Sequence, residues 1–321
     1  MTTGDEEPTD FHLGIDENGL GPRLGPMIVT AVMARTTKAG AKVVGRKARG
    51  KLATRLGDSK GLVAHGKIGL AEAWARVLVA RGAGKNREAG SPQQLLQAVS
   101  LDDQQRLRSP CPAGVEAQCW SYNQLTFDDG FITTRLLDTL SKDLDRLARR
   151  GVHIVAVRSI ILCAKRLNLA AAAGENRFVA DLHAMERLIL ALRARAGRDV
   201  DAVCGKVGGF KSYGKAFGPL GGRLHTVLEE ERARSAYRFP GVGDIAFVRN
   251  VDDTNLLVGL ASLVGKYLRE LLMGNIVDRY RETDATLPRA SGYHDPVTAR
   301  FVLETATIRR QQEIPDICFE R

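Results

Sequence analysis

Cysteine is scarce in this sequence. The chain of 321 residues holds five cysteines, an odd number with no Cys-x-x-Cys spacing. This pattern excludes a disulfide framework, and Cys111 and Cys119, which lie eight residues apart, have no matching second pair that would make a zinc motif. We therefore expect all five cysteines to be reduced thiols.

Long apolar runs are also lacking. No stretch reaches the roughly 18 apolar residues that a membrane span needs. Residues 1–10 are acidic rather than basic and then apolar, which is unlike a secretory signal. Internal repeats and low-complexity tracts are absent as well. These absences predict a cytoplasmic protein without membrane association.

Positive charge, in contrast, is plentiful. The chain has 47 Lys and Arg against 37 Asp and Glu, a net charge of +10. Residues 35–57 contain eight basic side chains and no acidic one, among glycines and alanines, and we expect them to form a basic arm or loop. Such charge favours a polyanionic partner, although charge alone does not separate RNA or DNA from an anionic lipid surface or a surface charged for solubility.

The order of the predicted elements indicates an α/β fold. Apolar, β-branched runs predict strands over 11–16, 27–34, 152–157, 200–204 and 245–248, the first two joined by a Gly/Pro-rich turn. Apolar residues at helical spacing predict helices over 68–80, 133–150, 176–195 and 256–273. Strands and helices that alternate in this way predict a sheet with helices packed on it.

The organisation that we expect is one main domain with additions. Residues 1–10 read as an acidic disordered tail and 11–273 as the main domain. Within that domain, 82–129 is polar and irregular, and we interpret it as an insertion. Residues 274–321 are expected to form a small, peripheral helical region.

Asp16 and Glu17 are the first candidates for chemistry. They come at the end of the first predicted strand, followed by Asn18-Gly19-Leu20-Gly21-Pro22. Hard carboxylate oxygens at a strand end suit Mg²⁺ or Mn²⁺. The alternative is a solvated turn that happens to be acidic. Asp252 and Asp253, just after the last predicted strand, also have two interpretations: metal ligands, or acids that cap the helix that follows.

Residues 205–215 form a glycine-rich basic segment. Lys206, Lys211 and Lys215 alternate with Phe210 and Tyr213, a pattern that suits phosphate binding and base stacking. Ala216 stands where a nucleotide-triphosphate loop needs Ser or Thr, which argues against such a loop. A flexible basic loop and a plain surface loop both remain open.

These motifs together resemble the type 2 ribonuclease H family. The matches occur in the family's order: Gly14 to Pro26, Asp58-Ser59-Lys60, Asn176 with Ala184-Met185, Asp252 with Ala261-Ser262 and Lys266, and Gly292-Tyr293. The resemblance implies a ribonuclease H-like fold, a mixed sheet flanked by helices. It also implies an endonuclease whose four carboxylates hold two Mg²⁺ or Mn²⁺ ions for hydrolysis of RNA in RNA/DNA hybrids or at embedded ribonucleotides. Such paired ions activate a water and stabilise the leaving oxygen.

The resemblance assigns roles to individual residues. Asp16 and Glu17 match the first two acids, and Asp252 matches the fourth. The remaining assignments concern the substrate: the Gly19-Leu20-Gly21 loop and Tyr293 at the RNA–DNA junction, and Lys60, Lys206 and Lys266 as contacts to phosphate or charges at the site.

Two positions depart from the family pattern. Cys204 occupies the place of the third acid, and cysteine is a soft ligand that suits Mg²⁺ poorly. Asp201, Asp253 and Glu175 are the acids we consider as replacements. Leu20 occupies the place of an arginine, which removes a phosphate contact. These departures favour an alternative function: a nucleic-acid-binding protein that keeps the fold with impaired catalysis.

Overall fold

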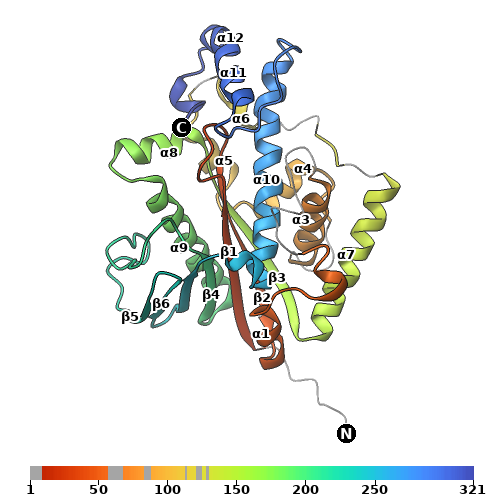
Figure 1. The fold of residues 1–321 in the computed structure, drawn as a ribbon, viewed down its shortest axis with the longest axis vertical. Helices are drawn as coiled ribbons and strands as arrows, with labels where there is room; N and C mark the ends of the chain where they lie inside the picture. The colour runs from red at the N-terminus through yellow and green to blue at the C-terminus, as the bar shows by residue number, and fades with distance from the viewer. Residues whose placement is uncertain (1–8, 57–67, 83–87, 113, 121–124, 128–129) are drawn as a thin grey trace.

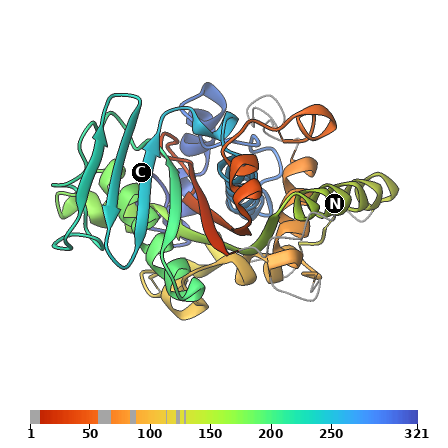
Figure 2. The ribbon, with the colours of Figure 1, turned by 90° about the horizontal axis from the view of Figure 1, so that it is seen from below.

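A single mixed sheet of seven strands forms the centre of the molecule. The computed structural model describes residues 9–56, 68–82, 88–112, 114–120, 125–127 and 130–321. The strands follow the order β3-β2-β1-β4-β7-β6-β5 in the sheet. Their bounds are β1 Asp10–Asn18, β2 Met27–Thr36, β3 Val152–Leu162, β4 Val200–Gly205, β5 Thr226–Glu230, β6 Arg234–Phe239 and β7 Gly243–Val248. β1, β4 and β7 run parallel, and the other neighbours are antiparallel. The predicted α/β class with a mixed sheet flanked by helices is confirmed (Figures 1 and 2).

Helices cover both faces of this sheet. Their bounds are α1 Lys38–Val44, α3 Gly69–Gly82, α4 Pro92–Val99, α5 Gln104–Arg108, α6 Glu116–Trp120, α7 Phe131–Arg149, α8 Ala164–Ala172, α9 Arg177–Ala196, α10 Leu256–Arg281, α11 Pro296–Glu304 and α12 Ala306–Gln311. Short 3-10 turns, η1 Gly50–Leu52, η2 Val251–Asp253 and η3 Asp316–Cys318, complete the described elements.

The alternation of strand side chains divides the core in two. In β2, Ile28 and Val32 pack with α3, α7 and α10, whereas Val29 and Met33 pack with α9. Side chains two apart on a strand share a face, so β2 serves both cores at once. The sheet therefore lies between α9 on one face and α10 with α3 and α7 on the other (Figure 1).

Local sequence signals explain where the two principal helices begin. The Asn176 side chain accepts a hydrogen bond from the Val179 amide at the start of α9, and Asn255 does the same for Leu257 and Val258 in α10. Such caps satisfy backbone donors that have no partner inside the helix. Gly197, whose φ of 70° is left-handed, follows the last residue of α9 and stops the helix.

Several sequence-based boundaries need correction. The described part of 82–129 is not irregular, since α4, α5 and α6 lie there and Leu95, Leu96 and Val99 of α4 are buried. Within 35–57, residues Lys38–Val44 are helical because Thr37 caps them. α10 continues past residue 273 to Arg281, and residues 290–319 pack against its end in a third apolar cluster. β5 and β6 were missed because their sequences are largely polar.

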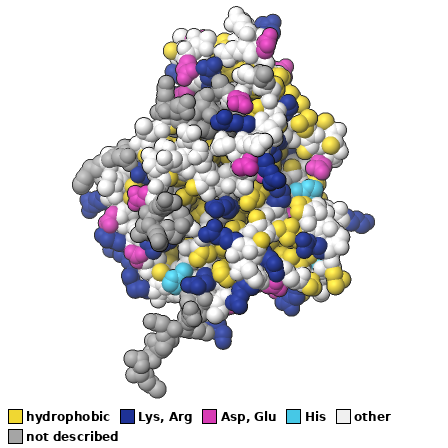
Figure 3. Space-filling view, turned by 180° about the vertical axis from the view of Figure 1, so that it is seen from behind, with side chains coloured by type: hydrophobic (Ala, Val, Ile, Leu, Met, Phe, Trp, Pro, Cys, Tyr) yellow, Lys and Arg dark blue, Asp and Glu magenta, His cyan; other side chains and the backbone are white. Residues whose placement is uncertain are grey.

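Other expectations can be placed as well. Asp10 opens β1, and residues 1–8 of the predicted tail lie outside the described residues. All five cysteines are described and are free thiols. In the part of the chain that the structure describes, no helix is both long enough and apolar enough to cross a membrane. Lys and Arg side chains are spread over the face seen in Figure 3.

Candidate active site

The end of β1 brings the first two predicted acids into the middle of the sheet. Asp16 pairs with Thr30 and Glu17 with Val29 in the β1–β2 ladder, so both acids lie within the strand rather than in a turn. Because neighbouring strand residues alternate in direction, they face opposite sides. Gly14, on the side of Asp16, lies against the backbone of α10, whereas Leu13 and Ile15, on the side of Glu17, pack in the α9 core.

Asp16 occupies a crowded position between β1, β4 and α10. Its carboxylate accepts a hydrogen bond from the Ser262 hydroxyl, and a Cβ added to Gly205 would lie 3.0 Å from its Oδ1. Surrounding protein atoms, followed by the charges of Glu17 and Asp252, raise the pKa of Asp16 to about 7 in spite of the Ser262 bond. The side chain is partly exposed by surface area, so it is reachable from the pocket and still poorly solvated.

Glu17 is held by the loop that follows it. The Leu20 amide donates a hydrogen bond of 2.5 Å to Glu17 Oε1. Burial raises the Glu17 pKa, while this amide and the charges of Arg321 and Arg269 oppose the rise. Glu17 is therefore better compensated than Asp16.

Asp252 reaches the same place from the turn that precedes α10. It lies in the η2 turn and lines the pocket that Asp16 and Glu17 also line, and its charge acts on Asp16. The cap of α10 is Asn255, so the helix-capping interpretation does not account for Asp252. The structure thus brings together the three acids that the sequence predicted.

These acids lie in a pocket of about 580 Å³. Its wall includes the segment Gly19 to Pro22, which Arg321 supports by donating to the Gly19 and Pro22 carbonyls at 2.7 and 2.6 Å. Gly19 has a φ of +101°, a conformation that favours glycine. Tyr293, 48% exposed, lies on the rim with the Arg269 guanidinium 4.6 Å from its ring centre.

The predicted lysines have different placements. Lys266 lines the pocket. Lys206 lines it too, but its ammonium donates at 2.8 Å to both the Ser235 hydroxyl and the Glu231 carbonyl. Lys60 lies outside the described residues. Tyr213 of the 205–215 segment is fully buried and stacks on Phe247 at 4.1 Å, so it is a core residue and does not stack on bases.

At the position of the third acid, Cys204 is fully buried. Burial, then the charges of Asp181 and Asp16, raise its thiol pKa well above the usual range, so the thiol stays protonated. Among the acids considered as replacements, Asp201 lies beside His12 at 3.8 Å, Glu175 is exposed, and Asp253 is not in the pocket lining.

The structure adds an acid that the sequence analysis missed. Asp181 of α9 is 1% exposed, and the charges that act on it are those of Glu17 and Asp16. The signal in the sequence is an acid inside an apolar stripe, because Asp181 shares its helix face with Met185, Leu188 and Leu192.

The donor set suits a hard divalent ion in kind, since it consists of carboxylates beside a thiol that stays protonated. As the side chains stand, no three acidic, imidazole or thiol groups among the described residues are close enough to enclose an ion. An ion held by these acids would need a closer arrangement of their side chains; Glu17 Oε1 now accepts from the Leu20 amide.

No protein-family model matches the chain, and no curated protein sequence does. Solved structures that match include ribonuclease HII from Archaeoglobus fulgidus in its complex with PCNA, at 15% identity and a TM-score of 0.45 over 96% of this chain and 93% of that one. Ribonuclease HIII from Bst, in complex with Mn²⁺, matches at 11% identity and 0.38 over 94% and 72%. Ribonuclease H2 from Pyrococcus horikoshii matches at 12% identity and 0.37 over 96% and 92%. These likenesses are too distant to assign a family, so the function is argued from the residues of this chain.

Proposed function

We propose that this protein is a divalent-metal-dependent endonuclease that hydrolyses RNA in RNA/DNA hybrids or at embedded ribonucleotides. The observation that carries the proposal is the meeting of Asp16, Glu17 and Asp252, from β1 and η2, at one pocket. Like charges gathered in a poorly solvated place are costly unless cations accompany them. A cluster of this kind is therefore suited to divalent ions.

The chemistry follows from the donor set. When bound, Mg²⁺ or Mn²⁺ stabilises the charge that develops on a phosphoryl group and activates water. Hydrolysis adds the water oxygen to phosphorus, breaks one P–O ester bond and leaves a proton on the departing oxygen. Asp16, Glu17 and Asp252 would hold the ions, and Ser262 fixes the Asp16 carboxylate through its hydroxyl. The Gly19–Gly21 backbone and Tyr293 offer the surface for the ribonucleotide.

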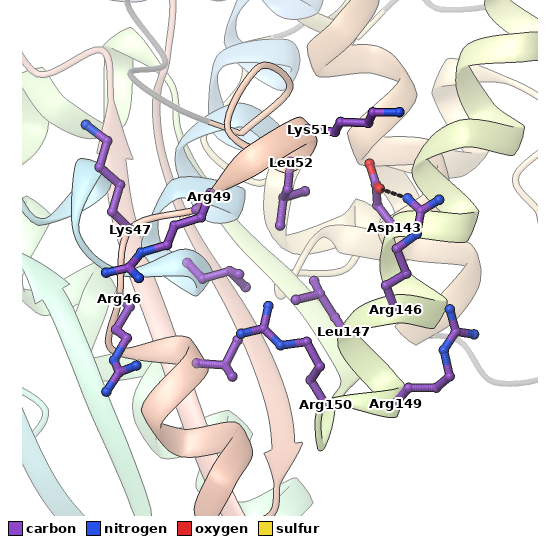
Figure 4. A pocket seen from close by; sticks show the side chains of 13 residues that line it. Arg46, Lys47, Arg49, Lys51, Leu52, Asp143, Arg146, Leu147, Arg149 and Arg150 are labelled. Carbon is purple, nitrogen blue, oxygen red and sulfur yellow. Dashed lines mark hydrogen bonds and ion pairs between the residues drawn. The ribbon is translucent and has the colours of Figure 1, made fainter.

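A basic cleft next to this pocket supports a nucleic-acid substrate. The cleft measures about 610 Å³ and is lined by Leu256, four residues after Asp252, and by basic side chains from the segment after α1 and from the end of α7 (Figure 4). These are Arg46, Lys47, Arg49, Lys51, Arg146, Arg149 and Arg150. Among the described residues of its lining, Asp143 is the one acid, and it is paired with Arg146 at 2.6 Å and Arg55 at 2.7 Å. The cleft therefore offers net positive charge that suits the phosphates of a duplex.

Charge reversal in this cleft tests its role. The double variant Arg149→Glu/Arg150→Glu is expected to bind a hybrid duplex at least about tenfold more weakly. The slope of log affinity against log salt concentration is expected to fall by the amount that about two phosphate contacts contribute. Both side chains are exposed, so folding should be unaffected. Fluorescence anisotropy with Ca²⁺, over a series of salt concentrations, measures the effect. Arg289→Glu/Arg300→Glu, the same charge change on exposed residues elsewhere, is the matched control; equal losses in the two double variants would assign the effect to net charge alone.

The proposed activity is tested on labelled duplexes. We expect cleavage of a duplex that carries one ribonucleotide, or of a full RNA/DNA hybrid, with Mg²⁺ or Mn²⁺, and none of the all-DNA duplex. The protonated thiol of Cys204 favours the alternative function, a binding protein with impaired catalysis. Salt-dependent binding without cleavage under either metal would establish that alternative.

A further inference from the structure

Asp181 is a buried carboxylate that lacks the usual compensation. It is 1% exposed, and its Oδ1 has no hydrogen-bond partner among the described residues. Buried polar groups in folded proteins nearly always have a partner, and an unpaired buried charge is among the costliest features that a fold can carry. A residue of this kind calls for an explanation.

The neighbourhood of Asp181 increases the cost. Its charged neighbours are Glu17 and Asp16, both acids, and together with burial they raise its pKa well above the ordinary range. Another buried acid of the same helix, Glu186, is treated differently by the fold. The amides of Gly218 and Leu220 donate to its carboxylate at 3.2 and 2.6 Å. The fold thus supplies partners to Glu186 and leaves Asp181 beside two acids.

Asp181 also lies near Cys204 of β4, a strand position that carries no charge. Cys204 is the register partner of Ile15, the residue before Asp16, and α9 packs on both β1 and β4. The Cys204 thiol senses the charges of Asp181 and Asp16 but stays protonated itself. The acid Asp181 of α9 is therefore a neighbour of Cys204 in β4, whose side chain is neutral.

We propose that Asp181, beside Cys204, supplies a fourth negative charge to the cation-binding cluster of Asp16, Glu17 and Asp252. The inference rests on the proposed function, because it concerns the same site. Asp181 is not part of the pocket wall, so it contributes its charge from α9, on the face of the sheet that Glu17 faces. A divalent cation in the pocket would be the missing compensation for the buried acids.

The experiment measures Mn²⁺ binding by the full-length protein, by calorimetry and by electron paramagnetic resonance. Asp181→Asn, which keeps the shape and removes the charge, is expected to weaken Mn²⁺ binding at least about tenfold. It is also expected to raise the melting temperature of the metal-free protein and to reduce the further rise that Mn²⁺ gives the wild type. Glu186→Gln is the matched control: it removes a buried acid of the same helix and should lower the melting temperature without changing Mn²⁺ affinity.

A second variant keeps the test decisive. Asp181→Asn/Cys204→Asp returns a carboxylate to the strand and should recover Mn²⁺ binding that Asp181→Asn loses. Wild-type Mn²⁺ affinity in Asp181→Asn, or no Mn²⁺ binding by the wild type, would overturn the inference. If Asp181→Asn binds Mn²⁺ and cleaves duplexes like the wild type, the inference fails while the proposed function stands. If Mn²⁺ binding depends on Asp181 but no duplex is cleaved, the proposed function fails instead.

Discussion

An Asp16→Asn variant is expected to lose cleavage activity by about 10³-fold or more while it gains stability in the absence of metal. Activity falls because Asp16 is the acid that the Ser262 hydroxyl fixes and on which the charges of Glu17 and Asp252 act. Stability rises because surrounding protein raises the Asp16 pKa from 3.8 to about 7, which corresponds to a penalty of up to about 4 kcal/mol for the ionised form. Opposite changes in activity and stability are typical of a residue kept for function.

The pH dependence of stability has a definite sign. An acid whose pKa is higher in the folded state contributes stability at low pH and loses it as pH rises through the folded value. For Asp16 the loss falls between about pH 4 and about pH 7. Burial also raises the pKa values of Glu17 and Asp181, which adds to the same trend. Metal-free wild type should therefore unfold more readily near neutral pH than at mildly acidic pH, and Asp16→Asn should show less of this decline.

Chemical denaturation across this pH range, with chelator present, measures the effect. Asp278→Asn, an exposed acid of α10 paired with Arg289, is the control and should change stability by no more than about 0.5 kcal/mol. Full wild-type cleavage by Asp16→Asn would remove Asp16 from the site. A less stable variant would mean that the Ser262 hydrogen bond outweighs the burial cost.

Local sequence predicted the part of the site that depends on local structure. Asp16 and Glu17 end a strand because apolar residues precede them and Gly19 and Pro22 stop the ladder after them. The same reasoning predicted Asp252 as a candidate, since it lies between β7 and α10. Alternation along a strand says which of its residues share a face, and it places the two acids of β1 on opposite faces.

Contacts between distant elements were beyond such reasoning. Asp181 occupies an apolar stripe of α9, and only the packing of α9 on β1 and β4 shows that it meets Glu17. Lys206 lines the pocket, and its ammonium also bonds to Ser235 of β6. β6 itself was missed, so that partner was invisible in the sequence. The acids at the ends of predicted strands and helices were found, and the one that packing brings to them was not.

A Gly14→Ala variant is expected to lose both stability and the site. A Cβ at Gly14 would lie 2.2 Å from the Leu257 carbonyl carbon and 2.3 Å from the Val258 nitrogen, which are backbone atoms of α10 that cannot turn aside. Overpacking of a core usually costs about 1–3 kcal/mol, and a clash with backbone should reach or exceed the top of that range. We expect a fall in melting temperature of several degrees or failure to fold.

The same contact explains why the damage should reach the chemistry. β1 carries Asp16. α10 carries Ser262 and follows the η2 turn, which carries Asp252. The distance between β1 and α10 therefore sets the distance between Asp16 and Asp252. Gly21→Ala is the matched control, because an added Cβ there meets nothing within 4 Å. Thermal unfolding and Mn²⁺ titration of both variants measure the effect. If Gly14→Ala folds with a lowered melting temperature but binds Mn²⁺ like the wild type, the cluster does not depend on this contact. If affinity falls with stability, the glycine that lets strand and helix touch is also what brings Asp16 to Asp252.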